Sequence, residues 1–382
     1  KPKAIILKEN KSLKNKFKKT FIIGKILKKK ISNKQLIFSY QLVPSSSIAY
    51  LMFTSGSTGD PKGVAISHSK LLFFSDWCKE NFDIKKNDIG TNLNPLFFDN
   101  SVFDIFGILF NGSCLVALSR EEILNANEAV KFLKKKKVSI WFSVPSLITY
   151  FQRFKTFTKK KIPTLKKIIF GGEGFPKKDL KKLYIDFKGS AKLYNVYGPT
   201  ECTCICSSYK ISDFDFTKKE LSRFAPFGKR LAKNFKYLII GRDNKEVKIG
   251  QVGELFIGGD NVGNGYYHSP EETKTKFVQN PLHKKFNDLF YKSGDLVYQD
   301  RNSKLIYFYS RQDNQIKLNG YRIELNEIEN NLNSIKGVKE CAVTFGNKNK
   351  KKEITAWVHT KLKSDFIMHQ ITNLLPSYMI PK

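Results

Sequence analysis

The residues best suited to chemistry lie in the run TSGSTGDPKG at positions 54–63. Glycines let a backbone turn several N–H groups towards one point, hydroxyl side chains add donors, and a lysine adds positive charge. The apolar runs IAYLMF and VAIS on either side predict a strand before and after the loop. The run therefore predicts a loop that holds a polyphosphate, and the alternative is an ordinary Gly/Ser turn between two strands.

Two familiar nucleotide-binding motifs do not match this loop. The motif G-x-x-x-x-G-K-[ST] requires Ser or Thr after its lysine, whereas Gly63 follows Lys62 here. The spacing also differs from the dinucleotide-binding fingerprint. A different way of binding phosphates is therefore expected.

A second group of candidates lies in NVYGPTE (195–201), YKSGD (291–295) and SRQD (310–313). Glu201 offers a hard oxygen ligand that suits Mg²⁺. Tyr197 offers a flat ring for adenine, and Asn195 a donor and an acceptor for the edge of the base. Asp295 suits ribose hydroxyls, and Arg311 could reach ribose or phosphate. The alternatives are a surface turn carboxylate for Glu201, a core aromatic for Tyr197, and a structural salt bridge between Asp295 and Arg311.

The order of these motifs resembles that of the adenylate-forming (AMP-binding) superfamily, which contains acyl-CoA synthetases, luciferases and the adenylation domains of nonribosomal peptide synthetases. Further segments extend the resemblance to amino-acid adenylation domains and D-alanine–carrier protein ligases. They are GELFIGGDNVGNGY (253–266), SRQDNQIKLNGYRIELNEIE (310–329) and LPSYMIP (375–381). The resemblance runs from about residue 48 to the last residue.

The resemblance implies a site for ATP and Mg²⁺. Lys62, Glu201 and Arg311 are its expected catalytic residues, and Glu201 is the expected metal ligand. The expected nucleotide-binding residues are Thr54, Ser55, Gly56, Ser57, Thr58, Gly59, Lys62, Gly171, Asn195, Tyr197, Gly198, Thr200, Glu201, Asp295 and Arg311.

The acid to be activated is suggested by NPLFFDNSVFD (94–104), which places a carboxylate in an apolar stretch. Such a carboxylate needs a partner. The resemblance implies that Asp99 pairs with the α-ammonium of an amino acid; the alternative is a cap for a helix that begins at Ser101 or Val102. The same resemblance implies a mostly apolar side-chain pocket for a small or medium apolar amino acid, with D-alanine as one candidate. Its residues are Asn100, Phe103, Ile169, Gly171, Val196, Cys204 and Ile205.

Apolar runs alternate with amphipathic segments, which indicates an α/β fold. The resemblance implies a large multi-sheet α/β N-terminal domain at 1–312 and a small mobile α+β C-terminal domain at 313–382. Asp313 would be the hinge between them. Rotation there would bring Lys317 and Gly320 into the site for transfer to a carrier-protein phosphopantetheine thiol.

Both ends differ from complete relatives of the family. A long N-terminal portion normally precedes the phosphate loop, and an N-G-K motif with a catalytic lysine normally follows LPSYMIP. Lys382 does not stand in that context. We therefore expect a partial chain that binds ATP but adenylates poorly.

The formal net charge of +33 does not by itself indicate nucleic-acid binding, because lysines are spread along the whole chain. Zinc-finger spacings and RNA-binding aromatic motifs are lacking. Cys202, Cys204 and Cys206 alternate, which predicts packing on one face of a strand rather than a metal site. The sequence shows no membrane-spanning stretch or signal peptide, and a cytoplasmic location is expected.

The sequence therefore predicts a ligase that activates an amino acid as aminoacyl-AMP, releases pyrophosphate, and transfers the amino acid to a carrier protein or domain. The alternatives are an acyl- or aryl-CoA synthetase and a catalytically impaired nucleotide-binding fragment.

Overall fold

The computed structural model describes residues 5–7, 20–22, 43–55, 61–217, 220, 224–228, 235–348 and 351–381, without side chains at 5–7, 20–22, 347–348 and 351–352. The chain divides into two compact units, Lys1–Ser47 and Ile48–Lys382. In the first unit, β1 (Ile5–Leu7) and β2 (Thr20–Ile22) form a parallel pair. Everything that follows concerns the second unit.

The predicted strands on either side of the phosphate loop are present. They are β3 (Ile48–Thr54) and β4 (Lys62–Ser67), which pair antiparallel with Thr54 opposite Lys62. Helix α3 (His68–Phe82) follows β4 directly. The loop residues Gly56, Ser57, Thr58 and Gly59 lie outside the described residues.

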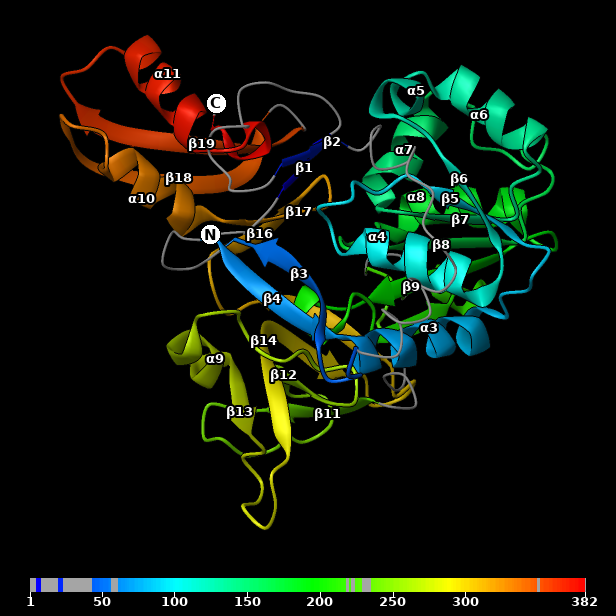
Figure 1. The fold of residues 1–382 in the computed structure, drawn as a ribbon, viewed down its shortest axis with the longest axis horizontal. Coiled ribbons are helices and arrows are strands. Elements are labelled where there is room, and N and C mark those ends of the chain that lie inside the picture. The colour runs from blue at the N-terminus through cyan, green and yellow to red at the C-terminus, as the bar shows by residue number, and fades with distance from the viewer. Residues whose placement is uncertain are drawn as a thin grey trace. The chain divides into compact units, whose positions relative to one another are not determined.

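A six-stranded sheet forms the centre of the green and cyan region of Figure 1. Its order is β10-β9-β8-β7-β5-β6, and only β10 runs antiparallel to its neighbour. The strands are β5 (Ile89–Asn92), β6 (Cys114–Ala117), β7 (Ile140–Ser143), β8 (Lys167–Gly171), β9 (Lys192–Tyr197) and β10 (Ser207–Lys210). Every residue of β7 and β8 is buried, as expected for parallel strands with helices on both faces.

The two faces of this sheet are covered by different helices, because successive strand residues point to opposite sides. Trp141 and Ile168 pack with α6 (Ala126–Lys135), α7 (Pro145–Arg153) and α8 (Lys177–Phe187). Phe142 and Ile169 pack with α3 and the π-helix η2 (Phe103–Ile108). Shorter elements nearby are α4 (Asn100–Val102), η3 (Leu109–Asn111), α5 (Arg120–Leu124), η4 (Thr200–Cys202) and η5 (Asp213–Phe216).

A second, antiparallel sheet has the order β11-β12-β14-β13, with β15 paired to β14. Its strands are β11 (Phe235–Ile240), β12 (Val252–Gly259), β13 (Phe277–Gln279), β14 (Leu289–Gln299) and β15 (Ile306–Arg311). Helix α9 (Pro270–Lys276) directly precedes β13 in the chain. Leu255, Tyr291 and Ile306 pack with Val64 and Ile66 of β4 in one core. The long strand β14 therefore shares a core with the strand that leaves the phosphate loop.

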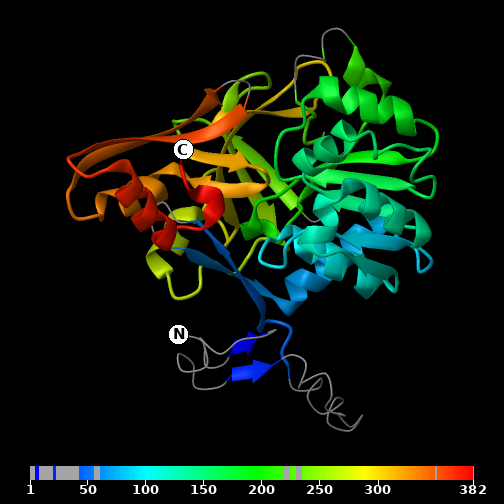
Figure 2. The same cartoon turned by 90° about the horizontal axis from the view of Figure 1, so that it is seen from above.

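The C-terminal part has a core of its own around Ile323, Ile328 and Ile371. In Figures 1 and 2 its long hairpin and last helix, drawn in orange and red, lie apart from the six-stranded sheet. Its elements are β16 (Gln315–Leu318), β17 (Tyr321–Glu324), α10 (Leu325–Asn333), β18 (Val338–Lys348), β19 (Lys351–Thr360), α11 (Ser364–Leu374) and η6 (Ser377–Met379). The predicted domain boundary at residue 313 and the mobility of this part stay predictions.

The predicted strand for the three alternating cysteines is wrong. Cys202 ends η4, Cys204 has a left-handed backbone with φ of 73°, and β10 begins only at Ser207. The turn brings the chain back to the end of β9. A Cβ added to Gly198, the residue after that strand, would be 2.3 Å from the Cys204 carbonyl oxygen. All three thiols are buried and free, and the described residues hold no cluster of three or more metal-ligating side chains.

Among the described residues, no helix combines the length and apolar composition needed to cross a bilayer.

Candidate nucleotide and amino-acid site

The predicted site residues gather at the carboxyl ends of β8 and β9, the edge at which open α/β sheets bind their ligands. Gly171 ends β8, Asn195 and Tyr197 lie in β9, and Glu201 lies in the turn that follows. A Cβ on Gly171 would lie 2.4 Å from the Val196 carbonyl oxygen, so the two strand ends approach as closely as they do only because this residue is glycine.

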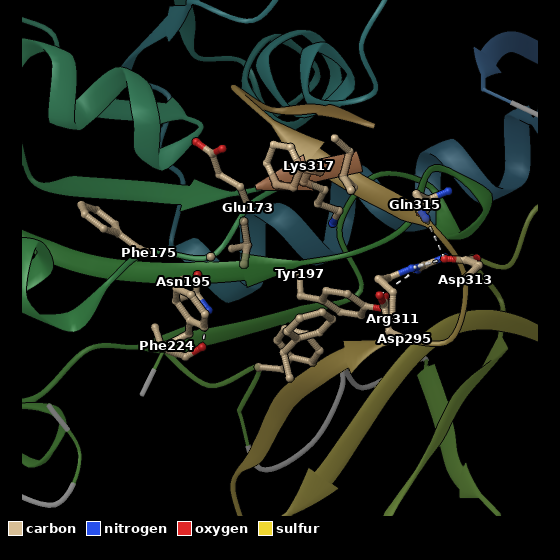
Figure 3. Close-up of a pocket in the computed structure, with 18 residues that line it drawn as sticks. Glu173, Phe175, Asn195, Tyr197, Phe224, Asp295, Arg311, Asp313, Gln315 and Lys317 are labelled. Carbon is tan, nitrogen blue, oxygen red and sulfur yellow. Dashed lines mark hydrogen bonds and ion pairs between the residues drawn. The ribbon is translucent and has the colours of Figure 1, made fainter. Parts of the chain in front are cut away.

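A cavity of about 430 Å³ opens beside these strand ends (Figure 3). The Tyr197 ring stacks on Phe227 with 3.9 Å between centroids. The Asn195 amide donates to the carbonyl oxygens of Ala225 and Pro226, at 3.3 and 3.0 Å, which fixes the orientation of its side chain. Tyr197 is therefore packed against a neighbour, as expected for a core aromatic. Its ring also forms one wall of a cavity large enough for a nucleoside.

Asp295 and Arg311 form the salt bridge that was the alternative for this pair, with 2.7 Å between Nη1 and Oδ1. The Tyr197 hydroxyl donates to the other oxygen of Asp295 at 2.6 Å. Burial, with the nearby Asp295 carboxylate, raises the pKa of Tyr197 well above its ordinary value, so the hydroxyl remains a donor. Arg311 also makes two hydrogen bonds to Asp313, at 2.9 and 2.7 Å. The predicted ribose ligand is therefore linked through Arg311 to the predicted hinge residue.

Glu201 is completely buried, so its alternative as a surface turn carboxylate is wrong. One oxygen accepts from the Tyr266 hydroxyl at 2.8 Å, and the other pairs with Nη1 of Arg322 at 2.9 Å. Burial alone would raise the pKa of Glu201, but the Arg322 guanidinium and several hydrogen bonds hold it below its usual value. The carboxylate is therefore ionised and neutralised by an arginine from β17.

A buried carboxylate is a suitable ligand for Mg²⁺, but both oxygens of Glu201 are engaged in this arrangement. The residues around it fit a metal ion only after Arg322 has moved away. The metal role of Glu201 stays a prediction.

Asp99 does not cap the helix that follows it, because its side chain makes no capping hydrogen bond. The Thr200 hydroxyl instead donates to Oδ2 of Asp99 at 2.6 Å. Burial raises the pKa of Asp99, while Thr200 and the Lys317 ammonium act in the opposite direction. Asp99, Asn100 and Thr200 line a second cavity of about 100 Å³. The two cavities share six lining residues: Gly172, Tyr197, Asp295, Arg311, Gln315 and Lys317.

The predicted apolar side-chain pocket falls in one buried cluster that contains Phe103, Ile169, Val196, Cys204 and Ile205. The structure thus brings these residues together on the α3 side of the sheet. Their role in contacting a substrate stays a prediction.

At the phosphate loop, the structure describes both ends. Thr54 is buried at the end of β3, and Lys62 begins β4 with its Nζ 3.6 Å from Glu272 and 5.6 Å from the Tyr266 ring centroid. The hydroxyl of Ser55 donates to the carbonyl oxygen of Arg322 at 3.2 Å. This last bond ties the loop's first residues to the C-terminal part of the chain.

The hairpin of β16 and β17 carries the predicted thiolation residues into contact with the site. Gly320, with φ of +83°, lies against Val144, where an added Cβ would be 2.5 Å from Cγ1. Tyr321 makes an edge-to-face contact with Phe98 at 4.8 Å, and the Lys317 Nζ lies 5.9 Å from the Tyr197 ring centroid. Lys317 and Gly320 therefore line the second cavity together with Asp99.

Comparison with known proteins decides the family, since the AMP-binding enzyme family matches residues 3–267. The chain belongs to the AMP-binding enzymes. The resemblance expected from the motifs is confirmed.

Two curated relatives of this AMP-binding enzyme are ligases or synthases. Bacitracin synthase 1 of Bacillus licheniformis is 35% identical over 343 residues, which cover 88% of this chain and 6% of that protein. D-alanine–D-alanyl carrier protein ligase of Bacillus cytotoxicus is 31% identical over 343 residues, covering 87% of this chain and 66% of that protein. The chain thus spans less than two thirds of the length of either relative.

A solved structure supports the same assignment. The Vibrio cholerae adenylation domain AlmE, in complex with glycyl-adenosine-5'-phosphate, matches with a TM-score of 0.81 and 25% identity over 99% of this chain and 70% of that chain. The predicted α/β fold with several sheets is confirmed as that of an AMP-binding enzyme.

Sequence reasoning missed several residues around this AMP-binding enzyme's cavities. Gly172 and Gly174 line the larger cavity and could have been found from the glycine-rich run beside Gly171. The aromatic walls come from distant segments, and no local pattern marks them. They are Phe224, Phe227, Phe308 and Phe345. Arg322 was also missed as the partner of Glu201.

Proposed function

We propose that this chain activates an amino acid with ATP in the cytoplasm, giving aminoacyl-AMP and pyrophosphate, and transfers the aminoacyl group to the phosphopantetheine thiol of a carrier protein. We further propose residues 1–312 as the large domain and 313–382 as the small mobile domain for this cycle. The names of the relatives, a D-alanyl carrier protein ligase and a bacitracin synthase, support this choice.

The observation that carries the proposal is the position of Asp99. Its half-buried carboxylate lines a cavity that adjoins a nucleoside-sized cavity through shared walls at Tyr197, Asp295 and Arg311. A carboxylate in a cavity with one hydroxyl partner has capacity for a cation. Because the two cavities share walls, one small molecule could place its α-ammonium at Asp99 and its ribose at Asp295.

The chain's own residues supply most of what adenylation needs. Tyr197 and Asn195 would hold the base, and the loop that ends at Lys62 would hold the β- and γ-phosphates. With its ammonium on Asp99, the substrate's carboxylate oxygen attacks the α-phosphorus while the bond to the pyrophosphate oxygen breaks. Mg²⁺, when bound, supplies charge neutralisation on the phosphates, with Glu201 as its proposed protein ligand.

The apolar cluster of Phe103, Ile169 and Val196 favours a small or medium apolar amino acid, including D-alanine. These three side chains themselves offer no ion-pair partner to a charged substrate side chain.

The test compares binding of aminoacyl-sulfamoyl-adenosine with binding of sulfamoyl-adenosine, using glycyl, L-alanyl and D-alanyl forms and calorimetry. We expect one aminoacyl form to bind roughly thirtyfold tighter than the parent, because a buried ion pair to the ammonium contributes about 2 kcal/mol or more. Asp99→Ala and the isosteric control Asp99→Asn should both remove that advantage and leave sulfamoyl-adenosine affinity unchanged. Amino-acid-dependent ATP–pyrophosphate exchange supplies the activity readout.

The outcomes separate the competing functions. An analogue with an acyl chain but no amine that binds as tightly as the aminoacyl form would favour a CoA synthetase. Loss of sulfamoyl-adenosine binding in both Asp99 variants would refute the ammonium-anchor role.

A further inference from the structure

The lysine expected to bind phosphates already has a carboxylate beside it. Nζ of Lys62 lies 3.6 Å from Oε1 of Glu272, and the Lys62 side chain is 10% exposed against 31% for Glu272. The Lys62 ammonium also lies 5.6 Å from the centroid of the Tyr266 ring. The lysine end of this ion pair is therefore enclosed, while its carboxylate end reaches water.

Hydrogen bonds beside β4 fix the position of Glu272. The N–H of Tyr267 donates to the carbonyl oxygen of Gly63 at 2.7 Å. Where the chain turns into α9, Oγ1 of Thr273 accepts from the N–H of Tyr266 at 2.9 Å. These bonds hold the first turn of α9, which contains Glu272, beside the start of β4. The carboxylate therefore reaches the lysine from a fixed position in the fold.

The neighbouring carboxylate of α9 is arranged differently. Glu271 pairs with Lys274 at 2.9 Å, three residues further along the helix, and both side chains are largely exposed. Such a pair is usual on the solvated face of a helix. Glu272 instead makes its ion pair with the first residue of β4. Two adjacent carboxylates thus carry the same charge but face different partners.

In the proposed reaction, Lys62 binds the β- and γ-phosphates of ATP. A lysine ammonium carries one positive charge, so a carboxylate already beside it reduces what phosphates gain from the same group. We propose that Glu272 competes with the β- and γ-phosphates for Lys62, and so limits how much tighter ATP binds than AMP. This inference rests on the proposed function.

The competition also bears on product release. After the bond to the α-phosphorus breaks, pyrophosphate carries the β- and γ-phosphates away from the site. Lys62 would then be an enclosed charge without its anionic ligand, which is unfavourable. Glu272 takes the place of the phosphates, so the lysine has a counter-charge before and after the reaction. The same carboxylate that lowers the affinity for ATP therefore favours the departure of pyrophosphate.

The test measures by calorimetry, with Mg²⁺ present, the dissociation constants of α,β-methylene-ATP, AMP and adenosine. The methylene bridge prevents cleavage next to the α-phosphorus, and only the first ligand carries β- and γ-phosphates. We expect Glu272→Gln to bind α,β-methylene-ATP roughly fivefold tighter than the unaltered chain, the scale of a partly exposed ion pair, and to leave AMP and adenosine within about twofold. Glu271→Gln is the matched control, because it makes the same change of charge one residue away. It should leave all three constants within about twofold.

A second comparison asks whether the effect passes through the lysine. In a Lys62→Met background, Glu272→Gln should change the affinity for α,β-methylene-ATP by less than about twofold, because competition requires the ammonium. A gain that persists in this background would overturn the inference, since the carboxylate would then act by general electrostatics. An equal gain in Glu271→Gln would overturn it for the same reason.

An unchanged affinity of Glu272→Gln for α,β-methylene-ATP would also overturn the inference while leaving the nucleotide site intact. A weaker affinity would overturn it too, and would mean that Glu272 orients Lys62 for the phosphates. If the unaltered chain binds none of the three ligands, the nucleotide site and both proposals fail together. Thermal melting of each variant, with Glu272→Ala as a second neutral substitution, separates a change of contact from a change of fold.

Discussion

Removing the Arg322 guanidinium should destabilise the protein far more than removing its partner's charge. Glu201 is completely buried, whereas the Arg322 side chain is 20% exposed. In Arg322→Met the carboxylate keeps the hydrogen bond from the Tyr266 hydroxyl, at 2.8 Å, but loses its ion-pair partner. Breaking a buried ion pair in this way costs about 3–5 kcal/mol. In Glu201→Gln the arginine can still reach water, so we expect a loss of about 1–3 kcal/mol.

The assay is a double-mutant cycle in equilibrium urea unfolding at neutral pH, with hydrogen exchange at β17 as a local measure. The double variant should recover much of the loss, because no uncompensated charge is left in the interior. We expect a coupling energy of about 2 kcal/mol or more. As a control, Lys236→Met removes an exposed ion pair to Asp288, and its loss should stay within about 1 kcal/mol. A coupling energy between Glu201 and Arg322 no larger than the loss of unfolding free energy in Lys236→Met would refute the reasoning.

Two other predictions follow from local geometry. Burial raises the pKa of Asp104 to about 7 despite hydrogen bonds from asparagine amides. Between about pH 4 and pH 7 the folded state therefore holds a proton that the unfolded state releases. The free energy of unfolding should fall as the pH rises through this range, by up to about 1.4 kcal/mol per pH unit. Asp104→Asn should remove this slope in urea titrations between pH 5 and 8, and an identical slope in the variant would contradict the assignment. Gly320→Ala should cost about 1–3 kcal/mol in thermal or urea unfolding, because a Cβ would lie 2.5 Å from Val144 at a φ of +83°. Val144→Ala should restore part of that loss, and no restoration would mean that backbone strain alone is responsible.

Much of the fold could be predicted from the sequence where the signal is local. The apolar runs on either side of the phosphate loop become β3 and β4 because short apolar runs next to a glycine- and proline-containing loop favour strands without distant help. The helix–strand alternation from α7 to β9 follows from the same kind of short-range pattern. Asn195 and Asp295 could be assigned to one site because each lies in a short motif, and the order of these motifs along the chain resembles that of a known family.

The partners of these residues could not be predicted, because they depend on tertiary contacts. Arg322 reaches Glu201 across 121 positions of the chain, and no local pattern specifies such a pair. Phe227 covers one side of Tyr197 from a segment with no motif. The strand prediction for the cysteines failed because a local pattern was overridden by a tertiary contact. The spacing C-x-C-x-C has the period of a strand, but the chain packs closely against Gly198 and forms a left-handed turn there.

Asp295 has one further consequence for the energetics of nucleoside binding. Its two oxygens already accept from Arg311 and from the Tyr197 hydroxyl, at 2.7 and 2.6 Å. A ribose diol bound at this carboxylate, as proposed, would exchange one set of hydrogen bonds for another, so each new bond would add only the difference between the two. The proposed affinity for adenosine would then come mainly from stacking and shape, and the carboxylate would select against sugars unable to replace the hydrogen bonds they displace.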